Sequence, residues 1–92
     1  MVTALVLINT LVDRIDEVAQ QLTDLDGVSE VYSVAGDVDL VAIVRVPEHD
    51  QLAEVIAGRI NKTAGIVDTR TMIAFQAYSR HDLEAAFSLG SA

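Results

Sequence analysis

Residues 31–46 read VYSVAGDVDLVAIVRV, two apolar segments separated by a small acidic turn. Residues 28–35 and 38–46 are rich in β-branched side chains, so they predict two antiparallel strands joined as a hairpin. Gly36 supplies the backbone freedom that a tight turn needs, and it also lets a ligand approach the main chain closely. Because two aspartates flank this glycine, the turn is where we expect a small polar ligand to bind.

The hydrophobic pattern on either side of the hairpin predicts two helices and two further strands. Residues 2–9 form a continuous apolar run, which is typical of a buried central strand. Apolar residues at helical spacing predict one helix within residues 13–25 and a second helix that begins just after Glu48 and ends near Lys62. Residues 66–78 alternate as a strand does. This order indicates an α+β, ferredoxin-like βαββαβ sandwich, in which a four-stranded antiparallel sheet carries both helices on one face.

Composition indicates one small domain that associates with copies of itself. The chain has 92 residues, 51% of them hydrophobic, and its mean hydropathy of +0.37 is high for a small monomer. Leu5, Leu7, Val41 and Ile43 belong to strands that are apolar on both sides, so one face of the sheet would stay uncovered. We therefore expect a homodimer that forms through the sheet.

Charge and residue usage exclude several classes of function. Fourteen acidic against six basic residues give a net charge of −8, which disfavours direct binding of nucleic acid. Asn9 and Asp13 make the first apolar run too short to span a membrane, no basic segment precedes that run, and we take the cytoplasm as the default location. Cysteine is absent. His49 and His81 lack the spacing of metal ligands, and we predict neither a metal site nor a cofactor.

Three stretches of the chain resemble a known family. They are VAGDVDL at residues 34–40, RVP at 45–47 and GIVDTRT at 65–71. In sequence and separation they resemble the effector-binding domain of the Lrp/AsnC, or feast/famine, transcription regulators, which is also called the RAM domain. Family members usually carry an N-terminal helix-turn-helix domain. Because nothing precedes the first predicted strand, we expect a stand-alone regulatory domain at residues 1–79 that lacks this helix-turn-helix domain. Leu83, Ala86 and Phe87 have helical spacing, so we expect the C-terminal tail at residues 80–92 to form a short helix at an interface.

The resemblance also implies a ligand and a site for it. The effector would be an amino acid or a related small metabolite, held where dimers meet in a higher oligomer such as an octamer. The ligand-binding residues would come from the hairpin turn and the last strand, namely Ala35, Gly36, Asp37, Val38, Asp39, Thr69, Thr71, Ile73 and Ala74. Asp39 would meet the ammonium group of the effector, and backbone amides near Gly36 and Asp37 would meet its carboxylate.

Simpler interpretations of the same residues remain open. Glycine and aspartate are ordinary turn residues, and threonine has a high strand propensity of its own. The chain could instead be a ligand-free assembly module that pairs with full-length regulators or, with less support, a small dimeric α+β barrel enzyme. An enzyme needs a nucleophile or a general base in a pocket. The sequence has no cysteine and places its histidines outside the predicted strands, so we predict that it is not an enzyme.

Overall fold

The computed structural model describes residues 1–80 and contains the predicted sheet and helices. The strands are β1 (Val2–Thr10), β2 (Val28–Ser33), β3 (Leu40–Val46) and β4 (Ile66–Ala74). The helices are α1 (Ile15–Thr23), preceded by the 3₁₀ turn η1 (Val12–Arg14), and α2 (Asp50–Ile56), followed by the 3₁₀ turn η2 (Ile60–Lys62). All strand pairs are antiparallel, in the order β2-β3-β1-β4. The ferredoxin-like α+β prediction is confirmed.

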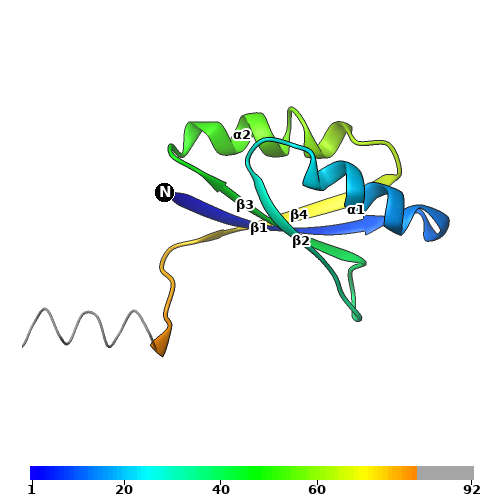
Figure 1. Ribbon diagram of the computed structural model, residues 1–92, viewed down its shortest axis with the longest axis horizontal. Helices are drawn as coiled ribbons and strands as arrows, with labels where there is room; N and C mark the ends of the chain where they lie inside the picture. The colour runs from blue at the N-terminus through cyan, green and yellow to red at the C-terminus, as the bar shows by residue number, and fades with distance from the viewer. Residues whose placement is uncertain (81–92) are drawn as a thin grey trace, which may run out of the picture.

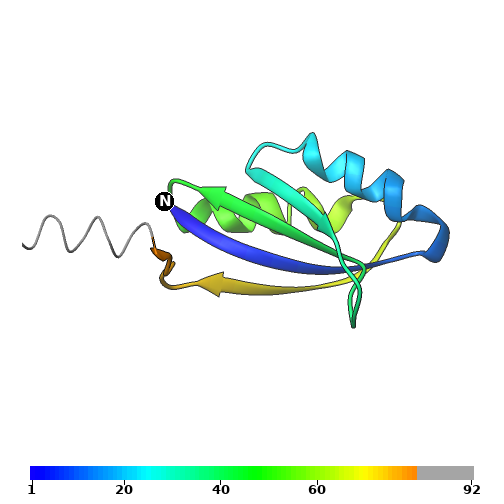
Figure 2. The same ribbon diagram turned by 60° about the horizontal axis from the view of Figure 1, so that its bottom comes forward.

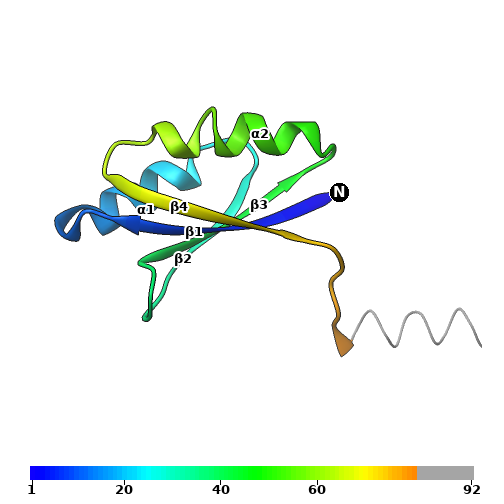
Figure 3. The same ribbon diagram turned by 180° about the vertical axis from the view of Figure 1, so that it is seen from behind.

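Strand β1 lies between β3 and β4 and carries the centre of the core. Its side chains alternate across the sheet, and Ala4, Val6 and Ile8 are fully buried on the side that the helices cover. Helix α1 packs Val18 and Leu22 onto this side. Helix α2 and η2 contribute Leu52, Val55 and Ile60 to the same core cluster. Both helices therefore lie on one face of the sheet (Figures 1 and 3).

The opposite face of the sheet has no cover within the described residues, as Figure 2 shows by bringing it forward. Its apolar centre consists of half-buried or exposed side chains from three strands: Leu5, Leu7, Val41, Ile43 and Met72. Met72 is 50% exposed. This surface, the open sheet face, is the apolar surface that the sequence predicts for association.

A polar cluster borders the open sheet face at its β2 edge. The Arg45 guanidinium donates to Ser29 Oγ at 2.6 Å and to Glu30 Oε1 at 3.2 Å, and the Tyr32 hydroxyl donates to Glu30 Oε2. The bond from Tyr32, reinforced by Arg45, lowers the pKa of the Glu30 carboxyl. The same bond raises the pKa of Tyr32, since the neutral hydroxyl is the form that donates. The cluster therefore borders the apolar surface with polar and charged groups that are bonded to one another.

The second predicted helix is divided into α2 and the 3₁₀ turn η2, and two sets of strand boundaries differ from the prediction. Strand β4 ends at Ala74 and not at residue 78, because Ala74 pairs with Thr3 and β1 begins one residue earlier. The hairpin strands end at Ser33 and resume at Leu40, so the turn between them is longer than predicted. The tail predicted at residues 80–92 lies, from residue 81 on, outside the described residues.

Within residues 1–80, no helix is long and apolar enough to cross a membrane. The same part of the chain contains no group of three or more side chains placed to hold a metal ion.

Two glycines of positive φ provide a matched test of the packing between α2 and the turn that precedes β2. A Cβ on Gly27 (φ +93°) would lie 2.6 Å from Val55 Cγ2, whereas a Cβ on Gly36 (φ +141°) would meet no atom within 4 Å. Both alanine variants carry backbone strain of about 1–3 kcal/mol, and Gly27→Ala adds overpacking of about 1–3 kcal/mol. Thermal unfolding at one protein concentration should rank wild type above Gly36→Ala and Gly36→Ala above Gly27→Ala. Equal melting temperatures for the two variants would contradict this packing.

Candidate functional site

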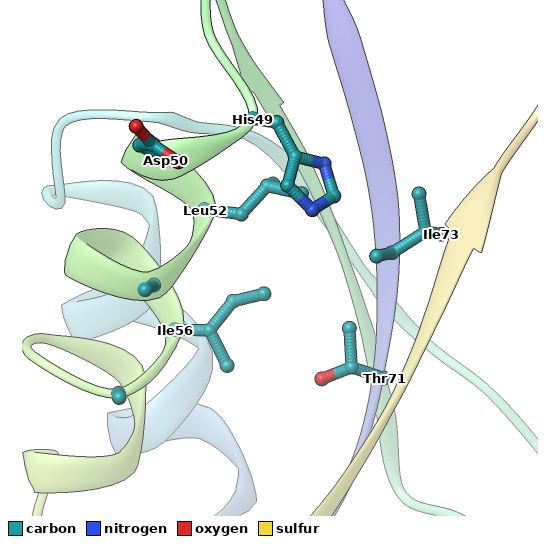
Figure 4. Close-up of a pocket in the computed structure, with 8 residues that line it drawn as sticks. His49, Asp50, Leu52, Ile56, Thr71 and Ile73 are labelled. Atoms are coloured by element: carbon teal, nitrogen blue, oxygen red, sulfur yellow. The ribbon is translucent and has the colours of Figure 1, made fainter.

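A cavity of about 360 Å³ lies between helix α2 and strand β4, and we call it the α2–β4 cavity. Figure 4 shows side chains from the helix and from the strand pointing toward each other across it. Its lining is His49, Asp50, Leu52, Ala53, Ile56, Ala57, Thr71 and Ile73. The walls are thus mainly aliphatic, with an imidazole, a carboxylate and a hydroxyl as the polar groups.

The local sequence explains why a cavity forms at this place. Leu52 and Ile56 are four residues apart and share one side of α2, with Leu52 directed into the core and only 5% exposed. Ala53 and Ala57 repeat the same spacing on the cavity wall, and their short side chains cannot fill the space up to the strand. Strand β4 is the edge of the sheet. The cavity is therefore the gap between a small-residue stripe on α2 and an edge strand.

Strand β4 presents alternate residues to this gap. Thr71 pairs with Val6 and Ile73 pairs with Ala4, both of which face the helices, so Thr71 and Ile73 point to the same side of the sheet. Thr69 shares that side, but its hydroxyl donates to Asn61 Oδ1 at 2.9 Å and it does not line the cavity. Ala74 points to the opposite side and lines a separate hollow with Phe75 and Met1.

The hairpin turn lies elsewhere on the molecule. Ala35, Gly36 and Asp37 are exposed, and Figure 1 shows the hairpin projecting away from α2. Val38 is only 9% exposed, so its side chain has little surface left for a ligand. None of the turn residues lines the α2–β4 cavity. Of the nine ligand-binding residues predicted from the sequence, the cavity thus brings together only Thr71 and Ile73.

Asp39 is held by strand β1 at both its backbone and its side chain. Its N–H donates to the carbonyl of Ile8 at 3.0 Å, and its Oδ2 accepts from the N–H of Thr10 at 2.9 Å. Its own carbonyl accepts from the N–H of Val34 at 3.1 Å, which closes the turn. Its binding to an effector remains a prediction, and one of its carboxylate oxygens is already used within the chain.

Sequence reasoning misses the α2 side of the cavity. The helical spacing predicts only that Leu52 and Ile56 belong to the core. From the sequence, His49 is considered only as a metal ligand or a catalytic residue, and both roles are excluded. A usable signal is the pair Ala53 and Ala57, since small residues repeated at a spacing of four leave a groove along a helix. The cavity adds His49, Asp50, Leu52, Ala53, Ile56 and Ala57 to the candidate site.

Comparison with protein families and curated sequences gives consistent matches. Residues 3–83 match the Lrp/AsnC ligand binding domain. The uncharacterized HTH-type transcriptional regulator PH1916 of Pyrococcus horikoshii is 34% identical to this chain over 59 residues. That match covers 64% of this chain and 39% of the regulator, so the chain spans less than half the length of the curated relatives it matches.

Solved structures give the same result at the level of the fold. TTHA0845 from Thermus thermophilus is 40% identical with a TM-score of 0.81, over 87% of this chain and 100% of that one. The feast or famine regulatory protein Rv3291c from M. tuberculosis, in complex with L-methionine, is 33% identical with a TM-score of 0.70, over 87% of this chain and 54% of that one. AsnC of E. coli, at 24% identity and a TM-score of 0.79 over 85% of this chain and 53% of that one, shows the likeness of fold alone.

Proposed function

The chain belongs to the Lrp/AsnC ligand-binding domain family, and on that premise we propose that it is a regulatory domain whose effector is an apolar amino acid bound in the α2–β4 cavity. The observation that carries this proposal is that Thr71 and Ile73, which the sequence assigns to the ligand, line one cavity together with aliphatic side chains of α2. Binding sites of this kind combine an apolar lining with a few polar groups that fix the orientation of the ligand.

The lining favours a particular class of amino acid. Leu52, Ile56 and Ile73 offer dispersion contacts to an aliphatic or thioether side chain. The Asp50 carboxylate and the Thr71 hydroxyl can accept hydrogen bonds from an ammonium group. The M. tuberculosis relative, 33% identical, was solved with L-methionine. Methionine is therefore the first effector to test.

We propose that the hairpin turn of a second copy closes the cavity. The turn residues that the sequence assigns to the ligand lie outside the cavity of their own chain, so both sets can touch one effector only if they come from different molecules. A Cβ at Gly36 would meet no atom within 4 Å, which leaves open space there for a neighbour. Amides near Gly36 and Asp37 would then receive the effector carboxylate.

The open sheet face supports a homodimer as the unit from which the higher oligomer assembles. Monomers rarely leave contiguous apolar patches larger than a few hundred Å². An effector held between dimers would shift assembly by its differential affinity for the two states, which is typically about 1–3 kcal/mol. Partnership with full-length regulators and a cytoplasmic location belong to the same proposal.

One prediction of the proposed function concerns the cavity. Ala53→Leu places a larger side chain on its helical wall and should abolish methionine binding, whereas Ala64→Leu, exposed and outside the cavity, should leave binding unchanged. In a thermal-shift titration, ligand at about 100 times Kd should stabilise wild type and the control by about 2.7 kcal/mol, but not Ala53→Leu.

If Ala53→Leu bound methionine with wild-type affinity, the cavity would not be the binding site. If none of the twenty amino acids stabilised the wild-type protein, the ligand-free assembly module would be the better interpretation.

Another prediction of the proposed function concerns the open sheet face. Leu7→Asp places a carboxylate at its centre and should convert the dimer to a monomer, because two such charges would be buried together. Met72→Asp, at a side chain already 50% exposed, tests the same surface with less risk to folding. Val12→Asp, at a side chain that is 92% exposed in η1 and outside the sheet, is the control. Light scattering that gives a dimer for both Leu7→Asp and Met72→Asp would exclude this interface.

A further inference from the structure

Asp39 completes the pairing of β3 with β1 by means of its side chain. The backbone pairing of the two strands ends at Ile8 and Leu40. Beyond that pair, the N–H of Asp39 donates to Ile8 O, and the next amide available on β1, that of Thr10, donates to Asp39 Oδ2 at 2.9 Å. The carboxylate thus takes the place of a strand carbonyl and extends the β1–β3 connection into the turn.

The amide that Asp39 receives lies at a buried irregularity of β1. The register between β1 and β4 shifts between Asn9 and Thr10, and Thr10 is only 7% exposed. An unpaired N–H in such a place costs about 1–3 kcal/mol. The carboxylate satisfies this amide, so the hydrogen bond has a reason to persist whether or not a ligand is present.

The same end of β1 also positions β4. Ile8 pairs with Thr69, and the N–H of Leu11 donates to Gly65 O at 2.9 Å just before β4 begins. The turn is therefore bonded to Thr10, the last residue of β1, and the start of β4 is bonded to the next residue, Leu11. A change in the Asp39–Thr10 bond would alter the placement of the turn relative to the strand that carries Thr71.

We propose that Asp39 is a positioning residue, which holds residues 34–39 in the orientation that closes the cavity of another copy, and that the effector ammonium is bound by other groups. This inference rests on the proposed function for its effect on binding. The bond to Thr10 itself belongs to the single chain and is testable without a ligand. The two roles of Asp39 make opposite predictions for asparagine, which keeps an acceptor oxygen but has no charge.

The test compares Asp39→Asn and Asp39→Ala by amide hydrogen exchange at Thr10 and by methionine affinity. Asp39→Asn should keep Thr10 protected and should bind methionine within about threefold of wild type, because a neutral acceptor still receives the amide. Asp39→Ala should lose roughly tenfold or more both in Thr10 protection and in affinity. Asp37→Ala, in the same turn but without a role in this bond, should keep Thr10 protected.

Two results would overturn the inference. Wild-type protection of Thr10 in Asp39→Ala would mean that the carboxylate does not hold the turn. A tenfold loss of affinity in Asp39→Asn with Thr10 still protected would show that the charge binds the ammonium directly. If wild type binds no methionine while Thr10 loses protection only in Asp39→Ala, the proposed function fails and the structural bond stands, so the two failures are distinguishable.

Discussion

Within residues 1–80, helices cover the sheet on one side only (Figure 1), and the rest of the described structure depends on this asymmetry. Strand β1 alternates between Ala4, Val6 and Ile8 under the helices and Leu5 and Leu7 on the uncovered side. Both helices pack on the same core, so they leave the second face of the four-stranded sheet without helical cover in this part of the chain. The apolar residues on the second face are therefore uncovered within the described residues (Figure 2), and this is the surface through which we propose that the domain dimerises.

The same two-layer packing accounts for the cavity. The core is centred on β1 and β3, where Leu52 and Val55 of α2 are buried, while β4 lies at the sheet edge. Alanines on the β4 side of the helix leave the space between helix and edge strand unfilled. A domain that packed α2 fully against β4 would gain dispersion energy but would have no site there. On the proposed function, ligand binding and core packing thus compete for the same surface of α2.

The sequence predicts the fold well because its determinants are local. Periodicity identifies all four strands and both helices, and the long β1 run correctly indicates a central strand. The errors arise where strand pairing sets the boundary of an element. Strand β4 stops at Ala74, whose partner Thr3 lies one residue from the beginning of β1, so almost no length of β1 remains for a longer β4 to pair with. The hairpin turn is longer than predicted because the Asp39 side chain, and not a backbone carbonyl, receives the Thr10 amide. No pattern within one segment encodes such a bond.

The site is less accessible to sequence reasoning because it depends on a distance between two elements. Alternation along β4 places Thr71 and Ile73 on one side, but the opposing wall is set by how far α2 lies from the strand. Ala53 and Ala57 look like ordinary helix formers until that distance is known. The hairpin turn is equally conspicuous in sequence, but the part that we propose for it depends on contacts between copies, which the structure of a single chain does not contain.

In the proposed oligomer, one molecule supplies the cavity and another supplies the turn. Coexpression of Ala53→Leu, which blocks the cavity, with Gly36→Val, which blocks the approach to the turn, tests this most directly. Calorimetric titration with methionine should detect no binding by either variant alone. It should detect binding by the mixed oligomer, in which an intact cavity from one variant meets an intact turn from the other. A mixed oligomer that binds no methionine, or a Gly36→Val protein that binds it alone like wild type, would contradict the account.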